Sequence, residues 1–132
     1  MIKLVFLMRK RADVSYDAFY RHWKGEHAQL VTQHAEQLKI RRYVQSHAMA
    51  PEYLGVFRPE WDDGQGWDGI AEVWLDSLDV LAGSRGTPHM DAIQDLLLAD
   101  EATFVDLERS TLLITEEHTF VDTITVDNGL TT

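Results

Sequence analysis

Four short runs of β-favouring residues divide the chain of 132 residues. They span residues 2–8, 41–47, 69–75 and 111–122. The first run is hydrophobic on both faces, which is typical of a strand that is covered on two sides. The second run alternates, and one of its faces carries Arg41, Tyr43, Gln45 and His47. The pattern therefore predicts four strands, one of them with a polar and aromatic face.

Helical periodicity follows the first run. Asp13 and Ser15 offer N-cap oxygens. At 100° per residue, one narrow stripe then holds Tyr16, Phe19, Trp23, His27 and Leu30. Gly25 weakens a helix by about 1 kcal/mol relative to Ala. We therefore expect a bend at residues 25–27 and a second helical stretch that ends near residue 37.

Two further helices are expected between the third and fourth runs. Ser77 offers an N-cap to a short helix that ends near residue 82. Thr87 followed by Pro88 is typical of the start of a longer helix, which we expect to reach about residue 98. Residues 100–107 are mixed in character and favour a further helical turn over a strand.

The order of these elements is βαβ followed by βαβ. It predicts an α+β fold, a ferredoxin-like split βαβ sandwich in which helices cover one face of a four-stranded antiparallel sheet. The first and last strands are apolar on both faces, so the second face of the sheet also needs a cover. Sheet-to-sheet association of two copies would supply it, and we expect a homodimer whose sheets close into a barrel. Residues 1–126 form the single predicted domain and residues 127–132 a C-terminal tail.

Charge and composition narrow the classes of partner. The chain has 12 Lys and Arg against 22 Asp and Glu, a net charge of −10, and no cysteine. This excludes disulfides, thiolate metal sites and cysteine nucleophiles, and it disfavours nucleic acid and anionic membrane surfaces. No apolar run approaches the roughly 20 residues that a membrane helix needs. We expect a cytoplasmic protein that binds a small molecule.

Three motifs carry a family resemblance. They are FYRHWKGEH at residues 19–27, YVQSH at residues 43–47 and WDGIAEVW at residues 67–74, and EEHTFVD at residues 116–122 looks like a matching last strand. Together they resemble the EthD-domain family of the dimeric α+β barrel superfamily. The resemblance implies a homodimer with a pocket in each subunit between helices and sheet. The superfamily includes cofactor-independent monooxygenases, muconolactone isomerases, haem-binding barrels and dehydratases of aromatic polyketide pathways.

His27 is the first candidate for a catalytic residue. It lies on the stripe that faces the sheet, where an imidazole in an apolar cleft can move a proton. The alternative is a core histidine bonded to a backbone carbonyl. His47 and Tyr43 share a strand face and would converge on His27 if that face looks at the helices. Otherwise His47 is a solvated strand-end residue and Tyr43 a core anchor.

Four residues are candidates for substrate binding. Phe19 and Trp23 on the helical stripe and Trp74 on the third strand would give flat apolar walls, or simply fill the core. Glu72 lies between Ile70 and Trp74 on one face of a strand, where a carboxylate must be paired or have a raised pKa. Its alternative role is to pair with Arg41 or Arg42 on a neighbouring strand.

Histidine spacing argues against a metal. The six histidines include no His-x-x-x-His pair, and residues five apart, such as His22 and His27, point about 140° away from each other on an α-helix. We expect no metal and no cofactor. A single axial histidine would also allow haem binding, with Arg41 as a partner for a propionate. No role is assigned to His22, His34, His89 or His118.

These observations give one hypothesis and two alternatives. The hypothesis is a small-molecule enzyme that acts on an aromatic or polyketide-like substrate by histidine acid/base chemistry. Its reaction would be a dehydration, an isomerisation or a cofactor-free oxygenation, in that order of preference. The alternatives are a haem-binding or haem-degrading enzyme and a non-catalytic ligand-binding protein that assists a degradative pathway.

Overall fold

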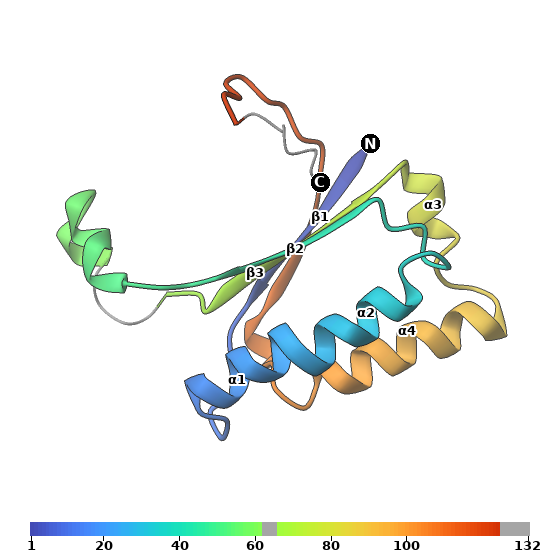
Figure 1. Cartoon of the computed structure of the whole chain (residues 1–132), viewed down its shortest axis with the longest axis horizontal. Coiled ribbons are helices and arrows are strands. Elements are labelled where there is room, and N and C mark those ends of the chain that lie inside the picture. The colour runs from blue at the N-terminus through green and yellow to red at the C-terminus, as the bar shows by residue number, and fades with distance from the viewer. Residues whose placement is uncertain (62–65, 125–132) are drawn as a thin grey trace.

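The sheet is the frame on which the other elements are arranged (Figure 1). The computed structural model describes residues 1–61 and 66–124, so the predicted tail at 127–132 lies outside the described residues. The strands are β1 (Ile2–Met8), β2 (Arg42–His47), β3 (Gly69–Leu75) and β4 (Thr111–Thr115). Their order is β2-β3-β1-β4, and all neighbouring strands are antiparallel. The predicted four-stranded sheet is confirmed.

Helices cover one face of this sheet (Figure 1). They are α1 (Tyr16–His22), the π-helical segment η1 (Trp23–His27), α2 (Ala28–His34), α3 (Leu78–Ala82) and α4 (Pro88–Glu101). Short 3₁₀ segments follow at η2 (Pro51–Val56), η3 (Pro59–Trp61) and η4 (Leu107–Arg109). The N-caps are the expected ones, because the hydroxyls of Ser15, Ser77 and Thr87 accept from the backbone N–H three residues later. The α+β split βαβ arrangement is therefore confirmed.

The bend expected at Gly25 is a π-turn. The N–H of Ala28 donates to the carbonyl of Trp23, five residues earlier, where an α-helix would bond four residues back. The side chain of Gln45 on β2 also donates to this carbonyl, at 2.8 Å. The wider turn joins α1 to α2 without breaking the helix.

The core lies between the helices and the sheet, at the end where β1 stops. Its fully buried members are Met8, Phe19, Trp23, Phe104 and Val105. Because strand side chains alternate, β1 sends Phe6 and Met8 toward the helices and Val5 and Leu7 toward the opposite face. The helices cover only the first of these faces.

The last strand is shorter than expected. The sequence predicts a strand over residues 111–122, whereas β4 ends at Thr115. Glu117 leaves the ladder and lies against the uncovered sheet face, where its carboxylate accepts from Lys3 at 2.8 Å and from Trp74 at 3.1 Å. These contacts fix the start of a segment, residues 116–124, that projects from the body of the molecule (Figure 1).

Within the described residues, no helix has the length and apolar character needed to cross a membrane.

Candidate active site

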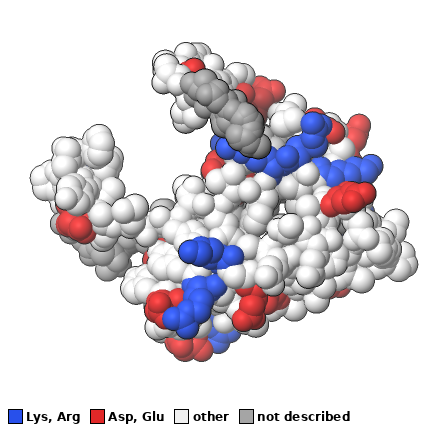
Figure 2. Space-filling model, viewed as in Figure 1, with Lys and Arg blue, Asp and Glu red and all other residues white. Residues whose placement is uncertain are grey.

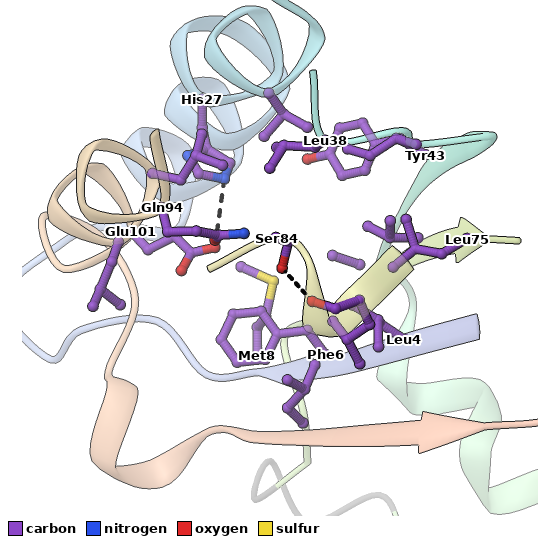
Figure 3. A pocket seen from close by; sticks show the side chains of 18 of the residues that line it. Leu4, Phe6, Met8, His27, Leu38, Tyr43, Leu75, Ser84, Gln94 and Glu101 are labelled. Carbon is purple, nitrogen blue, oxygen red and sulfur yellow. Dashed lines mark hydrogen bonds and ion pairs between the residues drawn. The ribbon is translucent and has the colours of Figure 1, made fainter. Parts of the chain in front are cut away.

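A cavity of about 390 Å³ lies between the helices and the sheet. Most of its lining is apolar, and it comes from all four strands, from η1, α2, α3 and α4, and from the loops between them. The polar lining residues are His27, Tyr43, Ser84, Gln94 and Glu101. Figure 3 shows His27 and Glu101 on the helical side, facing a floor that includes Leu4 and Phe6 of β1. An apolar cavity with a few converging polar groups is typical of a small-molecule site.

His27 presents one nitrogen to a carboxylate and the other to the cavity side. Its side chain is buried, and its Nδ1 lies 2.7 Å from Oδ2 of Asp100. An ionised carboxylate only accepts, so Nδ1 carries the hydrogen and Nε2 of the neutral ring is an acceptor. Burial lowers the pKa of His27, and the hydrogen bond to Asp100 opposes that change. The neutral imidazole is thus a base with a fixed tautomer.

Glu101 lies beside the other nitrogen of this base. Its Oε2 lies 3.7 Å from Nε2 of His27, an approach marked in Figure 3. Burial, and secondarily the charge of Asp100, raises the pKa of Glu101 to about 7. A carboxyl group in this range is present in both forms near neutral pH, so it can give or take a proton. His27 and Glu101 together form an acid/base pair at the cavity wall.

The π-turn brings His22 to the same carboxylate. Nε2 of His22 lies 3.0 and 3.1 Å from the two oxygens of Asp100, which also holds His27. The expectation that residues five apart point to different sides of the helix was wrong here, because it assumed α-helical geometry. A π-turn is wider, and residues five apart come onto one face.

Tyr43 and His47 have different surroundings. Both lie on the face of β2 that looks at the helices, as one of the two readings of this strand required. Tyr43 lines the cavity, burial raises its pKa, and its hydroxyl accepts from Gln45 at 2.8 Å. His47 stacks on Trp23 with ring centres 4.4 Å apart and is not among the lining residues. The structure therefore brings Tyr43, but not His47, to the cavity with His27.

Residues 11–108 match the family model of the EthD domain. The chain belongs to the EthD family. No curated protein matches the chain in a comparison of sequences.

Solved structures share the fold of this EthD protein. An ethyl tert-butyl ether d (EthD) family protein from Bacillus halodurans is 20% identical, with a TM-score of 0.58 and coverage of 89% of this chain and 99% of that one. A dimeric protein of unknown function with a ferredoxin-like fold, from Bacteroides fragilis, is 15% identical, with a TM-score of 0.57 and coverage of 88% and 95%. A putative antibiotic biosynthesis monooxygenase from Deinococcus radiodurans is 10% identical, with a TM-score of 0.53 and coverage of 95% and 100%.

The four substrate-binding candidates are divided among three environments. Trp23 lines the cavity, and Phe19 is fully buried in the core beside it without being a lining residue. Trp74 and Glu72 lie on the uncovered face of β3, because Val73 between them points into the cavity. Of the four candidates, only Trp23 lines this EthD cavity.

Glu72 has a structural partner on that uncovered face. Its carboxylate lies 2.8 Å from Nζ of Lys3, a residue of β1, and not beside Arg41 or Arg42. Arg41 instead pairs with Asp76 at 2.7 Å. Glu72 is therefore paired, as a strand carboxylate must be, but with a different cation from those expected.

Sequence reasoning missed the acidic half of the site. Asp100 and Glu101 close α4, beyond the expected helix end near residue 98. Two acidic residues in the last turn of a helix oppose its dipole, which favours cations at this end. That local conflict is a signal of a functional role, and it was available in the sequence.

Among residues 1–61 and 66–124, histidine, aspartate and glutamate form no group of three suited to a metal ion. The expectation that this EthD protein uses no metal stays a prediction.

Proposed function

We propose that this protein is a small-molecule enzyme that transfers protons on an apolar, aromatic or polyketide-like substrate held in the cavity. The observation that carries the proposal is the pairing of His27 with Asp100 at one nitrogen while the other approaches Glu101 at the cavity wall. The apolar lining suits a flat hydrophobic substrate.

The mechanism begins with His27 as the general base. Its Nε2 takes a proton from a carbon next to a substrate carbonyl, and Asp100 stabilises the imidazolium that forms, as a carboxylate bonded to the far nitrogen does in other histidine bases. Glu101, in its protonated form, donates to an oxygen of the substrate. If that oxygen is a leaving hydroxyl, the products are an alkene and water.

Tyr43 is the proposed group for the substrate carbonyl. Its oxygen already accepts from Gln45, so its own hydrogen is free to donate toward the cavity. A donor at this point would stabilise the negative charge that develops on the carbonyl oxygen when the carbon loses its proton. Return of that proton to another carbon would give an isomerisation, the second reaction class that we consider.

The proposal includes no cofactor. Among the described residues that line the cavity none is Lys or Arg, so haem propionates would have no cation within it. Addition of haem to the purified protein tests this: we expect no Soret band of a bound haem, and such a band would favour the haem alternative.

Deuterium exchange tests the proposed proton transfer without knowledge of the natural substrate. The probe is 2-tetralone, an apolar aromatic ketone with acidic hydrogens beside its carbonyl, incubated in D₂O and followed by NMR. We expect the protein to speed exchange well beyond an equal concentration of imidazole, and His27→Gln to remove about 10²–10⁴-fold of that acceleration.

The matched control is His89→Gln, which changes an exposed histidine at the start of α4. It should leave the exchange rate unchanged. Binding of 2-tetralone without accelerated exchange would contradict the enzyme and favour the non-catalytic ligand-binding alternative.

We also propose that the working unit is a homodimer joined through the uncovered sheet faces. This face carries Val5, Leu7, Ile70 and the half-exposed Leu113 beside the ion-paired Lys3. Figure 2 shows charged side chains at the base of the segment at residues 116–124, and few on the surface from there toward the segment at residues 48–61 in this view. The similar protein from Bacteroides fragilis is described as dimeric. Joining two such faces would bury their apolar side chains.

A further inference from the structure

A row of ionisable side chains runs from the surface to the cavity wall. In order they are Glu26, His22, Asp100, His27 and Glu101. The atoms that join them are 3.5 Å apart at Glu26 and His22, 3.0 Å at His22 and Asp100, 2.7 Å at Asp100 and His27, and 3.7 Å at His27 and Glu101. The proposed function uses the inner three of these groups and leaves His22 without a role.

His22 and His27 compete for the same carboxylate. Both ring nitrogens approach Oδ2 of Asp100, and both must donate, because the ionised carboxylate has no hydrogen to give. A carboxylate that binds a second donor gives less of its negative charge to the first. His22 thus weakens the attraction of Asp100 for the proton of a charged His27.

Few other charged or titratable groups face His22 and His27. From α4 the facing groups are Asp100 and Glu101, from the helix itself Glu26 and Arg21, and from β2 the phenol of Tyr43. Arg21 is bound to Asp17 at 2.6 Å. The cavity side chains from the other three strands are apolar. Besides His27, it is His22 whose ring nitrogen contacts the carboxylate of Asp100.

His22 contacts Asp100 from outside the cavity. Its side chain is 23% exposed and lines a separate surface hollow with Glu26 and Thr103. Its ring packs on Phe104, whose other contacts include His27, with ring centres 4.8 and 5.2 Å away. The π-turn holds the two histidines in this arrangement, since an α-helix of the same sequence would separate them.

We propose that His22 is a positioning residue for the reaction in the cavity: by sharing the carboxylate of Asp100 it keeps the imidazole of His27 a free base. This inference rests on the proposed function, in which His27 takes the proton. In this inference His22, which lies outside the cavity, controls the protonation of His27.

The test is a pH titration of the His27 imidazole by NMR in the full-length, ligand-free protein. His22→Phe removes the competing donor but keeps a ring against Phe104, and it should raise the pKa of His27 by roughly 0.5–1 pH unit. Asp100→Asn removes the carboxylate itself and should lower that pKa by about 1 pH unit or more. If the role of His22 were purely structural, the two substitutions would not shift the pKa of His27 in opposite directions.

Two further variants complete the experiment. His22→Gln keeps an N–H donor near the position of Nε2 and should restore a pKa close to that of the wild type. His34→Gln removes another helical histidine, whose Nδ1 bonds to the carbonyl of Leu30, and should have no effect. If His22→Phe fails to fold by near-UV circular dichroism, His22→Leu serves for the same measurement.

Either of two results would overturn the inference. One is a folded His22→Phe protein whose His27 pKa is unchanged or lower. The other is a raised pKa without a matching upward shift in the acid limb of the pH profile for 2-tetralone exchange. Failure of the proposed function is seen separately, as exchange that His27→Gln does not slow, so the two hypotheses are distinguished.

Discussion

Gly69 lies directly against the indole of Trp23. A Cβ at this glycine would fall 2.5 Å from Cζ3 and 2.6 Å from Cη2 of Trp23, and 2.8 Å from the carbonyl oxygen of Ser46. All three distances are too short for a side chain, so only glycine lets the indole reach β3. Because Trp23 lines the cavity, the missing side chain at the start of β3 sets the position of a cavity wall.

Gly69→Ala should therefore destabilise the fold. Overpacking of a tight core site costs about 1–3 kcal/mol of the free energy of unfolding. Urea denaturation measures this loss. The control is Gly25→Ala, an exposed helical position with no atom within 4 Å of its added Cβ, which should stabilise by up to about 1 kcal/mol. Equal effects of the two substitutions would contradict the tight packing of Gly69.

Glu101→Gln should change how stability depends on pH. Burial raises the pKa of this carboxyl from 4.5 to about 7 in the folded protein. Between these values the folded state keeps a proton that the unfolded state loses, so wild-type stability falls as pH rises, by up to about 3 kcal/mol. The variant lacks this loss, and its stability relative to the wild type should rise from pH 4.5 to 7 and then level off.

Urea unfolding at several pH values between 4 and 8 measures this difference. Glu108→Gln, which changes an exposed glutamate after α4, serves as the control and should run parallel to the wild type. A Glu101→Gln curve that also runs parallel would show that burial does not raise the pKa of Glu101.

Tyr43→Phe should slow 2-tetralone exchange while leaving the fold intact. The lost hydroxyl accepts one bond from Gln45, whose amide also donates to Trp23, so the cost in stability should be only about 0.5–1.5 kcal/mol. Loss of a donor to a developing oxyanion lowers a rate by about 10²-fold or more. Tyr53→Phe, at an exposed tyrosine of η2, is the control. Unchanged exchange in Tyr43→Phe would remove Tyr43 from the mechanism.

Leu113→Lys should convert the proposed dimer into monomers. Leu113 lies on the uncovered face of β4 and is 49% exposed in the single chain. A lysine there would be buried without a partner if two sheets pack together. Leu96→Lys on α4, at 46% exposure, is a closely matched control that should keep the dimer. Sedimentation velocity distinguishes the two, and a dimeric Leu113→Lys protein would place the interface elsewhere.

Local signals predicted the framework well. Caps at Ser15, Ser77 and Thr87 and the alternation of the strands act through near neighbours in the chain, so the sequence alone locates them. The face to which each strand turns depends on pairing across the sheet. For that reason Glu72 and Trp74 were expected at the substrate, whereas they lie on the uncovered face of the sheet.

The site was harder to predict, because it depends on one irregular turn and on contacts far apart in the sequence. His27 and Tyr43, which both line the cavity, were predicted from their positions on a stripe and a strand face. Asp100 lies 73 residues from His27 in the sequence, and no local sequence pattern indicates that the two side chains are in contact. Hydrophobic periodicity does not reveal the π-turn either, because a single wider turn changes the phase of the helix without changing its composition.

The π-turn matches the conformation of this segment to its residue count. It contains one residue more than an α-helical turn, and Lys24, Gly25 and Glu26 within it are exposed. A deletion of one of them would restore an α-helix in which His22 and His27 lie four residues apart and therefore still share one face. Asp100 could then still hold both histidines, whereas the segment at its present length, wound as a regular α-helix, would turn them about 140° apart. In an alignment of relatives, a one-residue gap in this segment is therefore compatible with the same pair of histidines, which then stand four residues apart.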